Sequence, residues 1–105
     1  MKPITLTLAA VERLQQIWEY TDERWGEEQA RRYLTGLHSS MEDIANSSRL
    51  GHIRQMQVKG RVVQFFRYQQ HFVYFTEKEN EVVILSILHG AMDIRKRLAE
   101  DLNKL

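Results

Sequence analysis

The sequence predicts an α+β domain: a short N-terminal strand and an antiparallel helical hairpin packed on a three- to four-stranded antiparallel sheet, then a short C-terminal helix. Apolar residues recur at helical spacing up to residue 45, β-branched and aromatic runs alternate with turn residues between residues 53 and 88, and helical spacing returns after residue 91. Such segregation of helices and strands is typical of the α+β class. The length of 105 residues fits a single domain, residues 1–105.

The first helix is predicted to begin after Thr7 and to end near Gly26. It follows a short extended piece, Lys2–Leu6, and the Thr7 hydroxyl is expected to cap its first turn. Its apolar stripe is expected to comprise Val11, Leu14, Trp18 and Thr21, with Ala10 and Ile17 beside it. Gly26 is expected to take the left-handed conformation that often ends a helix.

A second helix is predicted directly after the first. Glu27 and Glu28 suit its positive N-terminal end. Its apolar stripe is expected to comprise Ala30, Tyr33, Leu34, Leu37, Met41, Ile44 and Ala45. The polar run Asn46-Ser47-Ser48 is expected to end it. Because the connection at Gly26 is so short, the two helices are predicted to form an antiparallel hairpin.

The second half of the chain is predicted to form strands. A short strand fits between Gly51 and Gly60, around Ile53, Met56 and Val58. Two further strands are expected at Arg61–Tyr68 and His71–Thr76, although Gln69-Gln70 is a weak turn signal between them. A turn at Glu77–Asn80 leads to the next strand, and such short links predict an antiparallel meander.

The apolar run Val82–Leu88 is the stretch around which the fold is expected to form. Every position except Ser86 is apolar, and most are β-branched, which is typical of a strand buried on both faces. The polar groups that follow, His89 and Asp93, would then lie at the rim of the sheet, where functional residues are common. A final helix is predicted at Ala91–Leu105, with Ile94, Leu98, Leu102 and Leu105 on one side.

Composition excludes several classes of protein. The absence of cysteine excludes disulfides and thiolate zinc sites and is compatible with a cytoplasmic location. No apolar run is long enough to span a membrane, and no signal peptide is expected. No phosphate-binding glycine loop, Ser-His-Asp order or paired-carboxylate pattern occurs, so we expect no cofactor. His38 and Glu42 are spaced as a metal pair on a helix, but two ligands are too few and no metal site is expected.

Charge is segregated along the chain although the formal net charge is only +1. Residues 44–76 contain no Asp or Glu. They carry Arg49, Arg54, Lys59, Arg61 and Arg67, together with His52 and His71. Such a segment would attract an anionic partner. The alternative interpretation is that strands simply disfavour acidic residues.

Four segments in this order resemble the RelE/ParE toxin superfamily, and its ParE branch in particular. They are LTLAAVERLQQIWEYTDERWG, EEQARRYLTGLHSSMEDIA, LGHIRQMQVKGR and HFVYFTEKENEVVILSILHGAMDI. The resemblance covers nearly the whole chain, and the LHGAMD ending is its more specific part.

The resemblance implies the toxin of a type II toxin–antitoxin module. A ParD-like antitoxin would neutralise it in a hetero-oligomer, expected to be a heterotetramer, through a disordered segment that folds on the toxin. ParE-like toxins inhibit DNA gyrase and so block replication, whereas RelE-like relatives cleave mRNA at the ribosome. The shared fold does not choose between these activities. A third possibility is a module member that binds its antitoxin without being toxic. Sequence-specific DNA binding by this chain alone is not expected.

The nuclease alternative requires proton-transfer groups beside cations. Arg61, Arg67, His71 and His89 are the candidates. The nuclease branch of the resembled superfamily carries a tyrosine near its C-terminus, but no tyrosine follows Tyr74, and that place is occupied by MDIRKRLAEDL. This difference favours a toxin that acts by binding rather than as an enzyme.

Two sets of binding residues are predicted. The target-binding set comprises Arg54, Lys59, Arg61, Arg67, His89, Asp93 and Arg95. The structural alternatives are that His89 hydrogen-bonds a backbone group or Asp93, that Asp93 is the N-terminal acid of the last helix, and that the arginines are ordinary surface charges. The antitoxin-binding set comprises Ile17, Tyr20, Trp25, Tyr33 and Leu37, along which a partner helix could lie while an added strand pairs with a sheet edge.

Overall fold

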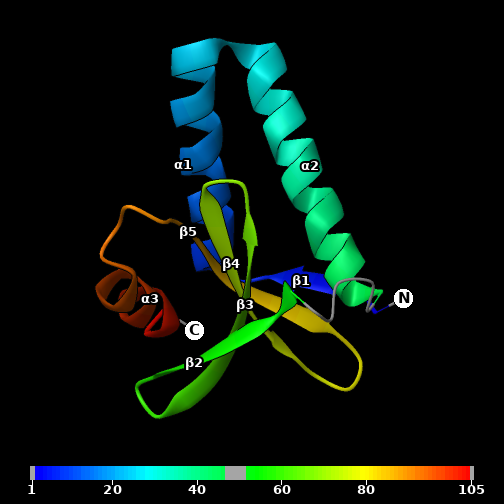
Figure 1. The fold of residues 1–105 in the computed structure, drawn as a ribbon, viewed down its shortest axis with the longest axis vertical. Helices are drawn as coiled ribbons and strands as arrows, with labels where there is room; N and C mark the ends of the chain where they lie inside the picture. The colour runs from blue at the N-terminus through cyan, green and yellow to red at the C-terminus, as the bar shows by residue number, and fades with distance from the viewer. Residues whose placement is uncertain (1, 47–51, 105) are drawn as a thin grey trace.

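Helices and strands succeed one another in the order that the sequence predicts. A computed structural model describes residues 2–46 and 52–104 (Figure 1). The elements are β1 (Ile4–Leu6), α1 (Leu8–Trp25), α2 (Glu27–Ala45), β2 (Arg54–Val58), β3 (Arg61–Tyr68), β4 (His71–Glu77), β5 (Val82–His89) and α3 (Ile94–Leu102). The predictions on Ser47, Ser48, Arg49, Gly51 and Leu105 concern residues outside those described.

The strands of the described residues form one sheet in the order β1-β5-β4-β3-β2. β2 to β5 form the predicted antiparallel meander. The difference from the prediction is that β1 joins the same sheet as a fifth strand, parallel to β5, with Ile4 opposite Val82 and Leu6 opposite Ile84. The backbone of a buried strand needs hydrogen-bond partners on both edges, and β1 supplies the second edge of β5.

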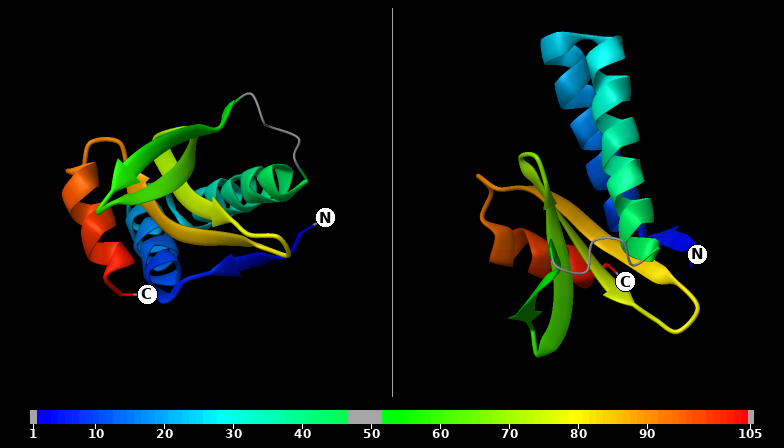
Figure 2. Two further views of the ribbon diagram at one scale, coloured as in Figure 1. Left: turned by 90° about the horizontal axis from the view of Figure 1, so that it is seen from below. Right: turned by 45° about the vertical axis from the view of Figure 1, so that its right-hand side comes forward.

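Helices cover both faces of the sheet. Phe66, Val73, Phe75, Ile84 and Ile87 pack under α1 and α2, and we call this side the hairpin face. Val63, Tyr74, Leu85 and Leu88 pack with Leu98 of α3, and we call this side the α3 face. The far end of the helical hairpin projects beyond the sheet (Figures 1 and 2). The prediction that Val82–Leu88 is buried on both faces is confirmed, with Val83 alone half-buried.

The buried face of α1 shares Leu14, Trp18 and Thr21 with the predicted stripe but is centred beside it. Ala10, Ile17 and Thr21 are buried and Leu14 is half-buried, whereas Val11 is 44% exposed. Thr7 fixes this orientation, because its hydroxyl accepts a hydrogen bond from Ala10 N at 3.1 Å and donates one to the Leu85 carbonyl at 3.1 Å. The stripe through Val11 and the stripe through Ala10 both have helical spacing. Because the Ala10 side chain is small, the stripe through Ala10 permits the helix to approach the sheet more closely. The cap at Thr7 is confirmed.

Gly26 alone connects α1 to α2. Its φ of 93° is positive, as expected, but its ψ of 169° lies outside the left-handed helical region. This part of conformational space is accessible essentially to glycine only. The predicted stripe of α2 is confirmed, since its members are buried or half-buried from Ala30 to Ala45. No helix among the described residues combines the length and apolar character required to cross a membrane.

Candidate partner-binding site

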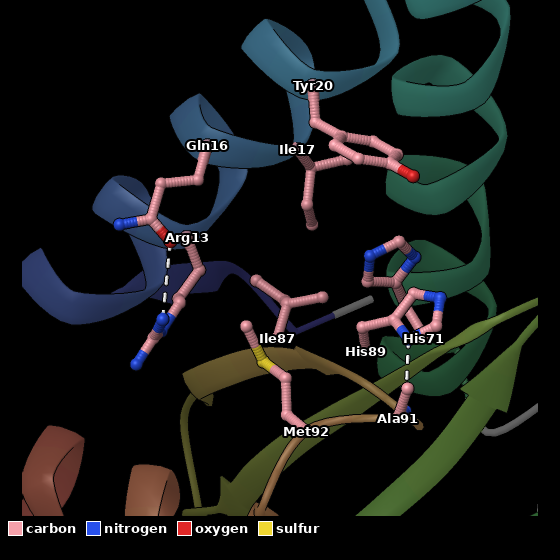
Figure 3. A pocket seen from close by; sticks show the side chains of 9 residues that line it. All are labelled: Arg13, Gln16, Ile17, Tyr20, His71, Ile87, His89, Ala91 and Met92. Carbon is pink, nitrogen blue, oxygen red and sulfur yellow. Dashed lines mark hydrogen bonds between the residues drawn. The ribbon is translucent and has the colours of Figure 1, made fainter. Parts of the chain in front are cut away.

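A cavity of about 510 Å³ opens between α1 and the ends of β4 and β5. It is lined by Arg13, Gln16, Ile17, Tyr20, His71, Ile87, His89, Ala91 and Met92. Figure 3 shows the two histidine rings at one end and Arg13 and Gln16 at the other, with apolar side chains between them. A largely apolar cavity with polar groups at its ends is suited to a ligand or a partner side chain.

His71 and His89 face each other across β4 and β5. They are register partners, and their rings are perpendicular with centroids 5.3 Å apart. Nδ1 of His89 accepts the Ala91 N–H at 3.0 Å, so in the neutral ring Nε2–H donates to Gln70 Oε1 at 3.2 Å. The alternative prediction that His89 bonds a backbone group is therefore confirmed.

Tyr33 of α2 holds His71 in place. Its hydroxyl lies 2.5 Å from Nδ1 of His71. Burial, together with the nearby His89, lowers the pKa of His71 to about 4, and burial raises the pKa of Tyr33 to about 12. At neutral pH the imidazole is uncharged and the phenol is protonated. The Tyr33 hydroxyl is also 3.4 Å from the Tyr68 carbonyl, so we assign its proton to the much shorter contact with Nδ1 and the ring proton of His71 to Nε2.

A smaller cavity of about 220 Å³ adjoins the first and shares Tyr20 and His71 with it. Beside it the end of the hairpin exposes aromatic surface, because Tyr20 is 53% exposed and Trp25 62%. Their rings meet edge to face at 6.2 Å, and the Arg24 guanidinium lies 4.9 Å from the Tyr20 centroid. Contiguous exposed aromatic side chains of this kind mark surfaces that bind partners.

The predicted antitoxin-binding residues divide into two groups. Ile17 and Leu37 are core residues, 7% and 0% exposed, so Leu37 is closed to a partner and Ile17 is reachable only through the cavity. Tyr33 is half-buried against His71, and only Tyr20 and Trp25 are exposed. Ile17 was predicted beside the apolar stripe of α1 and is in fact part of the core.

The basic residues lie on the other side of the sheet. Arg54 is opposite Phe65, and the Arg67 guanidinium lies 5.9 Å from the Phe72 ring, which places both on the α3 face. Arg61 is opposite Val58 and lines a separate cavity of about 520 Å³. Successive residues of a strand point to opposite faces. Arg61 and Arg67 therefore do not share a site with His71 and His89, which lie on the hairpin face.

The remaining residues of the predicted target-binding set have structural contacts. Asp93 caps α3 by accepting from Lys96 N at 3.4 Å, as its structural alternative predicted. Arg95 Nη1 donates to the Gln57 carbonyl at 3.0 Å, and Lys59 Nζ donates to Asn103 Oδ1 at 2.9 Å. Arg95 thus connects α3 to β2. Lys59, in the turn after β2, contacts Asn103, the residue that follows α3.

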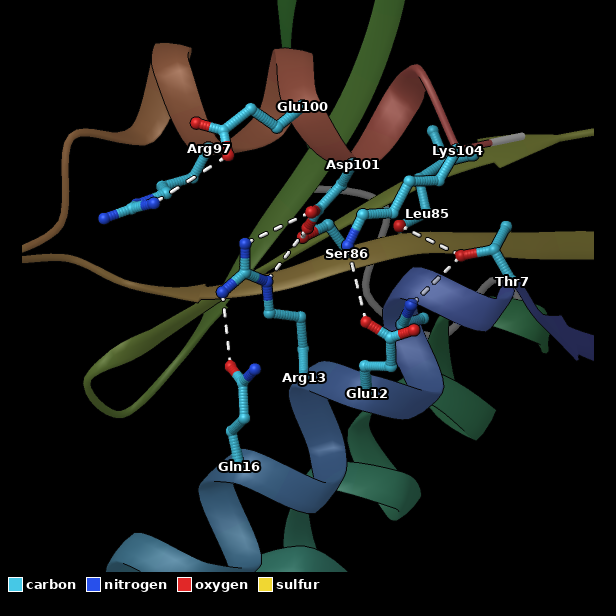
Figure 4. Close-up of polar contacts among 11 residues, drawn as sticks. Thr7, Glu12, Arg13, Gln16, Leu85, Ser86, Arg97, Glu100, Asp101 and Lys104 are labelled. Carbon is cyan, nitrogen blue, oxygen red and sulfur yellow. Dashed lines mark hydrogen bonds and ion pairs between the residues drawn. The ribbon is translucent and has the colours of Figure 1, made fainter.

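Arg13, which lines the cavity, belongs to a buried ion pair that the sequence did not predict. Nε and Nη2 of Arg13 donate to the two Asp101 carboxylate oxygens at 3.0 and 3.1 Å, and Ser86 Oγ donates to Asp101 at 2.5 Å (Figure 4). Asp101 is 1% exposed. The contact joins α1, β5 and α3, and Ser86, the lone polar residue of an apolar strand, was its sequence signal.

Metal ligation has no support among the residues that the structure describes, where no group of three or more His, Asp or Glu side chains comes together. His38 Nε2 and Glu42 Oε1 are 3.8 Å apart on the exposed side of α2. Both nitrogens of His89 are engaged in hydrogen bonds, so the ring could ligate a metal only by giving up one of them.

Comparison with known proteins relates the chain to a group of toxins. Residues 4–94 match the family described as the ParE toxin of the type II toxin–antitoxin system parDE. Toxin ParE of Escherichia coli is 30% identical over 103 residues, with 97% of this chain and 98% of the relative covered. Toxin ParE1 of Caulobacter vibrioides is 32% identical over 98 residues, covering 93% and 99% of the two chains.

A solved structure shares the fold. A chain of the chromosomal ParDE toxin–antitoxin system from P. aeruginosa superimposes with a TM-score of 0.71 at 21% identity, covering 85% of this chain and 96% of that one. The match shows that the two chains share a fold.

Proposed function

Since the chain belongs to the ParE toxin family of type II toxin–antitoxin systems, we propose that it is a toxin held inactive by a ParD-like antitoxin and directed against DNA gyrase. The single observation that carries the antitoxin proposal is the pair of adjoining cavities beneath the hairpin, beside the exposed rings of Tyr20 and Trp25. Exposed aromatic side chains beside apolar cavities are suited to a partner helix laid along them.

The antitoxin is proposed to occupy the hairpin face. Its disordered segment would fold on the toxin, with an apolar side chain entering the cavity beside Ile17 and Met92. β2 is an edge strand among the described residues, so it offers a place for an added strand. The toxin and antitoxin are proposed to form a heterotetramer, whose mass light scattering measures directly.

The protein is proposed to inhibit gyrase by binding to it and not by catalysis. The arginines and the histidines that a nuclease would need lie on opposite faces of the sheet. His71 is uncharged at neutral pH, and its Nδ1 is engaged by Tyr33. This geometry gives no support to RelE-type mRNA cleavage.

The target is proposed to meet the α3 face. Arg54, Arg61, Arg67 and Arg95 are all exposed on or beside this face, and among the described residues none of the four forms a salt bridge. The antitoxin would then cover one side of the sheet and the target the other. Neutralisation would require the antitoxin either to reach around the sheet edge or to leave too little room for the target.

Alanine variants of the hairpin test the antitoxin proposal. Tyr20→Ala and Trp25→Ala are expected to weaken binding of the cognate antitoxin about tenfold or more, because exposed aromatic side chains at interface centres carry much of the affinity. Arg61→Ala is the control, since Arg61 is exposed on the α3 face, on the other side of the sheet. Equal binding by all three variants in isothermal titration calorimetry would contradict the proposed site.

A further inference from the structure

The cavity beneath α1 contains hydrogen-bond donors and apolar side chains but no carboxylate. Neither this cavity nor the adjoining one is lined by Asp or Glu among the residues that the structure describes. The chain has 14 acidic residues, and none of them lines either cavity among the described residues. Glu12, Glu19, Asp22 and Glu23 lie on α1 itself but do not line either cavity.

α1 presents one particular face to the cavity. Its lining residues, Arg13, Gln16, Ile17 and Tyr20, are spaced by three, one and three positions and so follow a single helical stripe. The charge of Arg13 is balanced by Asp101, and its Nη1 donates to Oε1 of Gln16, the neighbouring lining residue, at 3.2 Å. The cavity is therefore suited to a group that is negatively charged or accepts hydrogen bonds.

His71 supplies a donor at the other end. With the Tyr33 proton assigned to the short contact with Nδ1, the proton of the neutral ring is on Nε2. Among the described residues Nε2 has no hydrogen-bond partner. The perpendicular His89 ring lies beside it, and the Nε2–H of His89 donates only to the exposed amide of Gln70, which an incoming acceptor could replace.

We propose that this cavity receives one acidic side chain of the antitoxin, flanked by apolar residues of an amphipathic segment, and that the carboxylate accepts a hydrogen bond from Nε2–H of His71. The inference rests on the proposed function and names the chemistry that the partner brings to the cavity. The apolar neighbours of that acid would pack on Ile17, Ile87 and Met92.

Binding of a carboxylate here would take up a proton. In the free protein the pKa of His71 is about 4, because burial and His89 disfavour its charged form. A carboxylate within hydrogen-bond distance favours the imidazolium and raises that pKa in the complex. Affinity would then be greatest below the pKa of the complex and would fall as the pH rises through it, by at most about tenfold per pH unit for one proton.

The groups that face His71 from neighbouring elements do not reverse the expected rise in the pKa of His71 on binding. α1 contributes Tyr20 and Arg13, and Arg13 is paired with Asp101. α2 contributes Tyr33, which is protonated at neutral pH. The ring of Tyr68 on β3 packs against Tyr33 with centroids 5.3 Å apart. His89 of β5, if protonated, would oppose a second proton on His71, so uptake of one proton is expected.

The test combines toxin variants with antitoxin variants. Each Asp or Glu of the antitoxin C-terminal segment is replaced by its amide and titrated against wild-type toxin, His71→Gln and the control Arg61→Gln, which lies on the α3 face. One acid is expected to couple to His71 and not to Arg61. Coupling means that the change in Kd of the double variant differs about tenfold from the product of the two single changes.

Wild-type proteins provide the second measurement, which does not depend on a variant folding. Calorimetric titrations at pH 6 in two buffers of different ionisation enthalpy are expected to show net proton uptake, and Kd is expected to decrease from pH 8 to pH 6. Wild-type binding that is independent of pH, with no acid coupled to His71, would overturn the inference and leave the proposed function standing. Coupling to Arg61 instead would also overturn it, whereas failure of the wild-type pair to bind would contradict the proposed function itself.

Discussion

The hydroxyl of Tyr33 on α2 lies 2.5 Å from Nδ1 of His71 on β4, and this contact joins the helical hairpin to the sheet at the rim of the cavity. The residues are 38 positions apart in the chain. Tyr33→Phe removes the donor and leaves a half-buried imidazole nitrogen without its partner. We expect the free energy of unfolding to fall by about 1 kcal/mol, the usual value for such a hydrogen bond.

Urea denaturation of wild type and Tyr33→Phe measures this difference. Tyr20→Phe is the control, because Tyr20 is 53% exposed and none of the hydrogen bonds among the described residues involves its hydroxyl. Equal midpoints for Tyr33→Phe and wild type would show that the contact contributes nothing to stability.

The buried ion pair between Arg13 and Asp101 gives a larger effect. Arg13→Gln leaves the Asp101 carboxylate, which is 1% exposed, with Ser86 as its remaining side-chain donor. Removing one partner of a buried pair is expected to lower the free energy of unfolding by about 3 kcal/mol. Arg31→Gln is the control, because its partner Glu27 is exposed and such pairs contribute about 0.5 kcal/mol or less. A similar small effect for both variants in chemical denaturation would contradict a stabilising role for the Arg13 contact.

Gly36 lies where α2 passes Tyr68 of β3. A Cβ at this position would lie 2.0 Å from the Tyr68 hydroxyl oxygen and 3.0 Å from Cζ. Within a helix, alanine is favoured over glycine by about 1 kcal/mol, so propensity alone predicts that Gly36→Ala stabilises the protein. We expect the steric conflict to dominate and the melting temperature to fall.

The double variant Gly36→Ala/Tyr68→Leu separates the two effects. Removing the ring should restore part of the stability that Gly36→Ala loses, measured against Tyr68→Leu alone. Thr35→Ala, on the exposed side of the same turn, should change stability little. A Gly36→Ala variant that melts above wild type would show that Tyr68 moves aside without penalty.

Stability should decrease in mild acid because of His71. Its pKa is about 4 in the folded protein and about 6.5 in an unfolded chain. The unfolded state therefore binds more protons between these values, so the stabilisation is fully present above pH 6.5 and is lost as the pH falls toward 4. The contribution to the slope is at most about 1.4 kcal/mol per pH unit. Denaturation at several pH values should give a flatter profile for His71→Gln, and identical profiles would contradict the buried neutral imidazole.

The buried face of a helix could be predicted from the sequence where the helix has only one apolar stripe. α2 has one apolar stripe, and its buried residues follow it from Ala30 to Ala45. α1 has two stripes of equal spacing, and the choice between Val11 and Ala10 depends on Thr7 bonding to β5, which is a tertiary contact. A three-residue strand such as β1 carries too little pattern to reveal a parallel partner nearly 80 residues away.

The candidate site was only partly predictable for the same reason. His71 and His89 were each recognised as candidates, but their contact depends on the register of β4 against β5. That register includes an irregularity at Tyr74 and Phe75, which a sequence pattern does not reveal. The separation of Arg67 from His71 also depends on the face of the sheet to which each side chain points.

Supercoiling of relaxed plasmid by purified DNA gyrase is the measurement that tests the proposed toxin activity most directly. The protein is added alone or after saturation with its antitoxin, and a parallel translation reaction is probed for cut mRNA. We expect loss of supercoiling with intact mRNA, restoration by the antitoxin, and a weaker effect of Arg61→Gln/Arg67→Gln. Unaffected gyrase together with mRNA cut at defined codons would contradict an inhibitor that acts by binding and would favour the nuclease.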